Sequence, residues 1–262
     1  MRSRRGVHSE ATLMFTMLSL ALISLAGCSR GPDAAFRRLE RAAELLRDNK
    51  PAAAQRAVDD VLNARPRDLQ VYMAAMQLFA AKRMHRQAAG VGELAIERLK
   101  SGDLRPAPSK EEHARLLYAV AQFHQEAGNL APAEANYRLA LELAPDAPEL
   151  LNGLGYFYAE ENLKLGEALR LTRRAVNLAP NAAHIIDSLG WAQYRLGDYD
   201  AAVGTLRRAV ELDPDEPTLR YHLAAAYAAQ EQRLAARIEA HKSALLGGDD
   251  PELAQLIKTL QT

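Results

Sequence analysis

Small residues recur along this 262-residue chain with a period of 34 or 35 residues outside one insertion, and this repeat constrains the fold more than any other feature. Pairs of mostly small residues stand 12 or 13 positions apart, and a further residue, again mostly small, follows each pair seven positions later. The pairs are Ala42/Ala54, Met76/Ala88, Ala121/Ala133, Gly155/Ala168, Gly190/Ala202 and Ala224/Ala236, and the residues that follow are Val61, Ala95, Ala140, Ala175, Ala209 and Ser243. Small side chains let two helix backbones approach closely. The lattice therefore predicts six antiparallel helical hairpins in a stack.

Prolines and turn residues mark the ends of these hairpins. Pro145, Pro180 and Pro214 are 35 and 34 residues apart, and each is placed to end a second helix. Turn signals at Asp48-Asn49, Gly128-Asn129 and Gly197-Asp198 fall between the two helices of a hairpin. The chain is rich in Ala, Leu, Arg and Glu, and only 6% of it is aromatic, which also favours helix.

Residues 189–214, LGWAQYRLGDYDAAVGTLRRAVELDP, resemble the consensus of the tetratricopeptide repeat (TPR) over almost their whole length. The resemblance implies an all-α fold, a right-handed TPR superhelix (an α-solenoid) of about six hairpins. The predicted repeats are 35–68, 69–102, 114–147, 148–182, 183–216 and 217–250. The hairpins within 34–100 diverge from the consensus, whereas the four within 114–250 follow it closely. Residues 251–262 are predicted to form a capping helix, because a terminal repeat needs a polar cover.

One insertion interrupts the array over residues 101–113, where SGDLRPAPSK contains two prolines and a glycine. We expect a longer loop, which solenoids tolerate on one face. The alternative is a break that divides the first two hairpins from the other four.

The N-terminus has the composition of a secretory signal peptide. Arg2, Arg4 and Arg5 precede an apolar run over residues 13–26, which is too short to span a hydrocarbon core. A basic start, a short apolar run and a small-residue exit predict a signal peptide over residues 1–27. The alternative is an anchor helix that is retained.

Leu25-Ala26-Gly27-Cys28 resembles the lipobox of bacterial lipoproteins. The resemblance implies cleavage before Cys28, the only cysteine, and acylation of that residue, palmitate included. Residues 28–33 would then be the lipidated cysteine and a short tether. Ser29, where inner-membrane retention would require Asp, implies the outer membrane. The predicted location is the bacterial envelope, with the repeats facing the periplasm.

Charge and motifs exclude several classes of function. Removal of residues 1–27 takes away three arginines and one glutamate, which leaves 30 basic against 32 acidic residues. The sequence therefore lacks the excess of basic residues that would indicate a nucleic-acid partner. The histidines lack metal-ligand spacing, so neither a metal nor a cofactor is predicted. His184, Asp187 and Ser188 invite comparison with a catalytic triad, but adjacent residues of one helix face different ways, and an enzyme is the minority alternative.

The TPR resemblance implies a concave groove lined by the first helix of each hairpin. The positions carried over are Tyr118, Gln122, Gln125, Glu126, Glu149, Asn152, Tyr156, Glu160, His184, Asp187, Trp191, Tyr194, Arg195, Thr218 and Tyr221. Aromatic rings and amides are typical of binding hot spots. The predicted partner-binding residues are accordingly Tyr118, Gln122, Asn152, Tyr156, Asp187, Trp191, Tyr194 and Tyr221.

Some of these aromatic residues have an alternative reading. Tyr156 and Tyr221 could instead pack between hairpins as core. Trp191, one residue after the crossing residue Gly190, is expected to face out of that crossing.

The sequence predicts a non-enzymatic, lipid-anchored scaffold with protein partners, a peptide or a helix in the groove, and with the membrane as the partner of its N-terminus. In layout it resembles the pilotin-like lipoproteins that assist pilus secretins, which implies a role in assembling or regulating an envelope complex. The alternative is an adaptor that presents substrates to a periplasmic protease or a cell-wall hydrolase.

Overall fold

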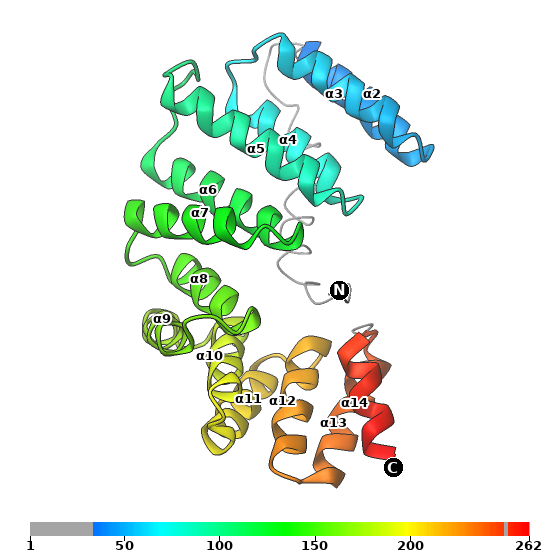
Figure 1. Ribbon diagram of the computed structural model, residues 1–262, viewed down its shortest axis with the longest axis vertical. Coiled ribbons are helices and arrows are strands. Elements are labelled where there is room, and N and C mark those ends of the chain that lie inside the picture. Colours follow the sequence, from blue (N-terminus) through cyan, green and yellow to red (C-terminus); the bar gives the residue numbers. More distant parts are fainter. Residues whose placement is uncertain (1–33, 249–250, 262) are drawn as a thin grey trace. The chain divides into compact units, whose positions relative to one another are not determined.

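The computed structural model describes residues 34–248 and 251–261, which form thirteen α-helices and contain no β-strand (Figure 1). These residues fall into two compact units that meet in sequence between Ala144 and Pro145. The predicted signal peptide, Cys28 and the tether lie outside the described residues. Within the described part of the chain, no helix combines the length and the apolarity needed to cross a membrane.

The N-terminal unit contains three helical hairpins. Its helices are α2 (Ala34–Arg47), α3 (Pro51–Asn63), α4 (Leu69–Ala80), α5 (His85–Lys100), α6 (Lys110–Glu126) and α7 (Leu130–Leu143). Each odd-numbered helix packs on the even-numbered helix before it, and α5 also packs on α6. Pro51 begins α3, where its missing N–H costs nothing because the first turn of a helix has no partner for that group.

The C-terminal unit contains three further hairpins and a single terminal helix. Its helices are α8 (Pro148–Glu160), α9 (Leu165–Leu178), α10 (Ala183–Arg195), α11 (Tyr199–Leu212), α12 (Pro217–Ala229), α13 (Arg233–Leu245) and α14 (Pro251–Gln261). The first helices of successive hairpins are neighbours, because α10 packs on both α8 and α12, and α12 also contacts α14. One surface of this unit is therefore built from α8, α10, α12 and α14.

The lattice of small residues occupies the helix crossings, as predicted. Every member is buried, and those that are not glycine have at most 1% of their surface exposed. A Cβ atom on Gly155 would lie 2.7 Å from Thr172 Cγ2, and one on Gly190 would lie 2.5 Å from Leu206 Cγ. Both distances are below normal van der Waals contact, so a larger residue at either position would force Thr172 or Leu206 to shift, and glycine is favoured.

The predicted turns also have the expected backbone. Gly128, between α6 and α7, has a φ of 78°, and Gly197, between α10 and α11, has a φ of 83°. A residue with a Cβ atom rarely adopts this left-handed conformation, so glycine fits both helix ends.

The predicted insertion over 101–113 is shorter than expected, because α6 begins at Lys110. Ser109 Oγ accepts a hydrogen bond from the Glu112 N–H at 3.2 Å, and Glu112 Oε2 accepts one from the Ser109 N–H at 2.7 Å. This reciprocal capping box fixes the first turn of the helix. The sequence contains this motif as S-x-x-E over residues 109–112.

The loop over 101–109 joins two packed helices and does not break the array. Leu104 is buried, and the Arg105 N–H donates to the Arg67 carbonyl at 2.8 Å, which ties the loop to the segment before α4. Because α5 packs on α6 across this loop, the alternative of a break after the second hairpin is wrong. The division between units falls after the third hairpin instead.

Helix α14 covers the end of the last hairpin. Its Leu253 and Leu260 are buried in a cluster with Tyr221 and Ala224 of α12 and Ala236 of α13. The face of α14 that carries these leucines is apolar, and the exposed residues of the helix are mainly polar. The helix therefore replaces the next repeat that the hairpin would otherwise need.

Candidate binding surface of the C-terminal unit

Polar contacts join successive first helices at a separation of one repeat. His184 Nε2 of α10 lies 3.1 Å from Glu149 Oε2 of α8. One hairpin further on, His222 Nδ1 of α12 lies 2.8 Å from Asp187 Oδ2 of α10, and both side chains are buried. Each pair is 35 residues apart. Glu149 and His184 occupy the same register position in adjacent hairpins, whereas His222 lies one position after Tyr221, the equivalent of Asp187, because the repeat is 34 residues long there.

A second set of contacts has a separation of 31 residues, which is one repeat less about one helical turn. Trp191 Nε1 donates to Glu160 Oε2 at 2.9 Å, joining α10 to α8. The Tyr221 hydroxyl donates to Glu252 Oε2 at 2.9 Å, joining α12 to α14. The same two separations thus connect all four first helices.

We name this surface the first-helix ladder. Its members are Glu149, Asn152, Tyr156, Glu160, His184, Asp187, Trp191, Tyr221, His222 and Glu252.

Trp191 lies at the centre of the ladder and is 3% exposed. The rings of Tyr194 and His222 stack on its indole at centroid distances of 4.7 and 4.1 Å, with interplanar angles of 14° and 17°. The Arg195 guanidinium lies 5.8 Å from the ring centroid. Trp191 points away from the crossing with α11, as expected, and its burial gives it a role in holding the first helices together. Its direct contact with a partner stays a prediction.

Two buried oxygen atoms of the ladder lack a hydrogen-bond donor among the described residues. They are Oδ1 of Asn152 and Oδ1 of Asp187, on residues that are 8% and 5% exposed. Buried polar atoms in folded proteins nearly always have a partner. Both oxygens are therefore candidates to accept a hydrogen bond from a bound group.

Tyr156 is half-buried beside two carboxylates. Burial raises the pKa of its hydroxyl well above the ordinary value, and the charges of Glu160 and Asp187 and a hydrogen bond with Glu160 raise it further. The hydroxyl therefore stays protonated at neutral pH and acts as a donor toward Glu160.

His184 is the more exposed histidine of the ladder. Its hydrogen bond with Glu149 raises its pKa above the usual value; burial opposes this shift, and the charges of Glu149 and Asp187 add to it. The imidazolium is therefore favoured beside these carboxylates.

The ladder is acidic. It carries Glu149, Glu160, Asp187 and Glu252, and Arg195 is the arginine beside it. In the part of the chain that the structure describes, the first three carboxylates form no ion pair with lysine or arginine. Their partners are instead an indole, a phenol and histidine side chains.

The residues that resemble a catalytic triad do not form one. His184 contacts Glu149, Asp187 contacts His222, and Ser188 Oγ donates to the His184 backbone carbonyl at 3.0 Å. No group of three His, Cys, Asp or Glu side chains that could hold a metal ion occurs among the described residues.

Two predicted binding residues, Tyr118 and Gln122, belong to α6 of the N-terminal unit, and both are half-buried. The ring of Tyr118 contacts that of Tyr137 edge-on at 5.6 Å. The Tyr137 hydroxyl donates to Gln125 Oε1 at 2.9 Å, so it joins α7 to α6. The other predicted residues lie in the C-terminal unit. Asn152, Asp187, Trp191 and Tyr221 are buried there, and Tyr156 and Tyr194 are half-buried.

The sequence analysis missed two ladder residues, His222 and Glu252. Neither residue stands at a groove position that the TPR resemblance carries over. His222 follows Asp187 by 35 residues, and Glu252 follows Tyr221 by 31. Their contacts with Asp187 and Tyr221 identify them in the structure.

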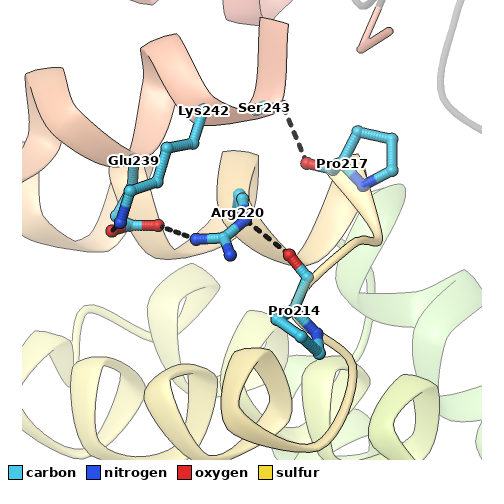
Figure 2. Close-up of polar contacts among 6 residues, drawn as sticks. All are labelled: Pro214, Pro217, Arg220, Glu239, Lys242 and Ser243. Atoms are coloured by element: carbon cyan, nitrogen blue, oxygen red, sulfur yellow. Dashed lines mark hydrogen bonds and ion pairs between the residues drawn. The ribbon is translucent and has the colours of Figure 1, made fainter. Parts of the chain in front are cut away.

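A separate polar cluster fastens α12 to α13 (Figure 2). Arg220 Nε donates to the Pro214 carbonyl at 2.7 Å, and Arg220 Nη1 lies 2.6 Å from Glu239 Oε2. Lys242 Nζ contacts the other oxygen of Glu239 at 2.8 Å. The Arg220 and Glu239 side chains are each 13% exposed, so this ion pair is largely shielded from solvent. These contacts give the cluster a role in stability.

This fold, hairpins of two helices stacked in register, defines an α-solenoid of helical repeats. A family model described as "TPR repeat" matches residues 190–231, and a second, described as "Tetratricopeptide repeat", matches residues 114–147. The chain therefore contains tetratricopeptide repeats, as its sequence predicts.

Two curated bacterial proteins match part of the chain. A TPR repeat-containing protein of Pseudomonas aeruginosa is 36% identical over 104 residues, which are 40% of this chain and 18% of that protein. Cellulose synthase operon protein C of Pseudomonas fluorescens is 32% identical over 117 residues, which are 42% of this chain and 9% of that protein. The chain thus spans less than a fifth of the length of either relative.

Solved structures share the fold. A tetratricopeptide repeat protein from Parabacteroides merdae aligns with a TM-score of 0.67 at 13% identity and covers 97% of both chains. The Cut9–Hcn1 structure aligns with a TM-score of 0.64 at 20% identity, over 96% of this chain and 46% of that one. At these identities the likeness concerns the fold alone.

Proposed function

We propose that this protein is a non-enzymatic TPR scaffold of the bacterial envelope, anchored by lipid at Cys28, which binds protein partners through the first-helix surface of its repeats. The TPR fold is consistent with a protein-interaction scaffold. The observation that carries the binding role is the first-helix ladder, where aromatic and polar side chains of four helices converge and two buried acceptors lack donors. The lipobox-like Leu25-Ala26-Gly27-Cys28 supports the anchor.

The proposed task is the assembly or regulation of an envelope complex. A lipid anchor confines a scaffold to one membrane surface, which favours partners that are embedded in or bound to that membrane. The alternative, an adaptor for a periplasmic protease or a cell-wall hydrolase, uses the same anchor and the same binding surface. The identity of the captured partner separates the two.

Replacement of Cys28 by alanine tests the anchor. In a bacterial host fed with labelled fatty acid, the native chain is expected to be processed and labelled. The Cys28→Ala variant is expected to accumulate as the full-length precursor without label, because the acyl acceptor is missing. Continued labelling of the variant would contradict the lipoprotein part of the proposal.

Cross-linked capture from envelope extract tests the binding role. The native chain is compared with Tyr156→Ala, which removes a half-buried ladder ring, and with Leu212→Ala, which removes an exposed apolar side chain of second helix α11. Capture of an envelope assembly protein should be lost with Tyr156→Ala and kept with Leu212→Ala. Equal capture by all three proteins would move the binding site away from the ladder. Circular dichroism of each variant confirms that it is folded.

A further inference from the structure

The charge of the first-helix ladder limits what can bind there. Glu149, Glu160 and Asp187 are held by neutral donors or by histidine, so their negative charge is not neutralised by a lysine or an arginine of the described chain. Glu160 accepts from Trp191 and from Tyr156, and Glu149 and Asp187 have one bond each described. An ionised carboxylate offers about four lone-pair sites, so all three retain acceptor capacity. These three carboxylates thus supply negative charge to a surface whose basic neighbours are His184, His222 and Arg195.

The unpartnered oxygens add a second, independent requirement, which is for hydrogen-bond donors. Asn152 Oδ1 and Asp187 Oδ1 are buried acceptors that need hydrogen-bond donors. Lysine and arginine side chains carry donors only, and a donor charge strengthens each bond to a carboxylate. An acidic side chain would add repulsion from the carboxylates, and neither an acidic nor an apolar side chain would supply a charged donor to these oxygens.

We propose that the first-helix ladder binds a basic segment of a partner protein, whose lysine or arginine side chains donate to Asp187 and Asn152 and lie beside Glu160. This inference rests on the proposed function and states the chemistry of the partner. Tyr156 and Tyr194, which are half-buried, border the surface and supply aromatic area for the aliphatic stems of those side chains. Arg195 is a basic side chain beside the ladder, since its guanidinium lies 5.8 Å from the centroid of the Trp191 ring.

The protein contains its own reporter for this binding. Trp191 is the single tryptophan of the chain and donates to Glu160, so its fluorescence senses the ladder directly. The probe is a short extended peptide of alternating lysine and serine, titrated into the full-length chain in detergent. Its matched counterpart alternates glutamate and serine. The basic peptide is expected to shift Trp191 emission in a saturable way, and the acidic peptide is not.

Charge-neutralising variants locate the site. Glu160→Gln retains an oxygen that can accept from Trp191 Nε1 but removes the charge. Asp187→Asn does the same beside His222. Glu211→Gln makes an equal change of charge on the exposed surface of second helix α11. Each ladder variant is expected to weaken basic-peptide binding about tenfold, the loss of one charge-assisted hydrogen bond, and the control to change it less than about twofold.

The outcomes are distinct. A saturable shift that is weakened by both ladder variants and kept by Glu211→Gln supports the inference. It is overturned if the acidic peptide binds as well as the basic one, if the basic peptide gives no shift, or if all three variants weaken binding equally. None of those results would contradict the scaffold proposal, which the capture experiment tests. The assignment of partner binding to the ladder is tested separately, and it is contradicted when Tyr156→Ala captures the same partner as the native chain.

Discussion

At the scale of single residues, neighbouring positions on one helix contact different parts of the structure. Gly190 faces Leu206 of α11 at a crossing that admits no Cβ atom, while Trp191 faces the adjacent first helices. Consecutive residues of a helix point in different directions, so the small residue and the ring can face different neighbours. Substitutions at this scale should therefore have effects that depend on which neighbour a side chain meets.

Gly190→Ala should lower the free energy of unfolding by about 1 kcal/mol. Alanine favours helix over glycine by about 1 kcal/mol, but the new Cβ would press on Leu206, and overpacking a core costs about 1–3 kcal/mol. Gly204→Ala is the matched control, because a Cβ there meets nothing within 4 Å. It should stabilise the protein by about 1 kcal/mol. Chemical denaturation measures both, and stabilisation by both variants would refute the tight crossing.

The His184–Glu149 pair should make stability depend on pH. The pKa of His184 is raised in the folded state, mainly by its hydrogen bond with Glu149. Its contribution is therefore fully present below the unfolded pKa of about 6.5 and is lost as the pH rises through the folded pKa. The difference in unfolding free energy between the native chain and His184→Gln should be larger at about pH 5.5 than at about pH 8.5. An unchanged difference would contradict this assignment.

At the scale of elements, first and second helices differ in what they contact. First helices of the C-terminal unit contact one another through the ladder, and each second helix supports its partner through the small-residue crossings and, in α13, through the Arg220–Glu239 cluster. Helix ends follow local sequence: the capping box at Ser109 and the prolines that open α3, α8, α12 and α14 are readable in the chain. Pairing between elements is what gives these helices stability, since isolated helices of this length are marginal.

Arg220→Ala should destabilise the C-terminal unit by about 2 kcal/mol. The change leaves the Pro214 carbonyl without this donor and removes the arginine partner of a largely buried Glu239. Arg207→Ala is the control, because its pair with Glu211 is exposed and 3.9 Å long, and such pairs contribute about 0.5 kcal/mol or less. Thermal unfolding followed by circular dichroism compares the two. Similar melting temperatures for both variants would show that the cluster contributes no more to stability than the exposed Arg207–Glu211 pair.

At the scale of the whole molecule, the described chain consists of two units, each with a core of its own. The C-terminal unit buries its apolar residues between α8 and α14, and α14 closes the last hairpin with Leu253 and Leu260. Stacked repeats are stabilised by their nearest neighbours, so a unit that has both a core and a cap meets the requirement for folding separately.

A fragment of residues 145–262 should therefore fold alone. We expect a helical circular-dichroism spectrum, cooperative unfolding and the emission of a buried Trp191. Removal of residues 249–262 from this fragment should cost about 3 kcal/mol, because two leucines of α14 leave the core and Tyr221 loses Glu252. A fragment that shows no cooperative transition would mean that the unit depends on the rest of the chain.

The sequence by itself determined the repeat, the number of hairpins after residue 33, the small residues at the crossings and the terminal helix. These features depend on local periodicity and on the size of side chains, and both can be read from the amino-acid sequence. The tertiary structure alone decided that Trp191 is buried among rings, that Asp187 pairs with His222, that the 101–109 loop keeps its neighbours packed and that the units divide after Ala144. Those outcomes depend on how one hairpin is rotated against the next, which fixes which residues 31 and 35 positions apart meet, and no local pattern encodes that rotation.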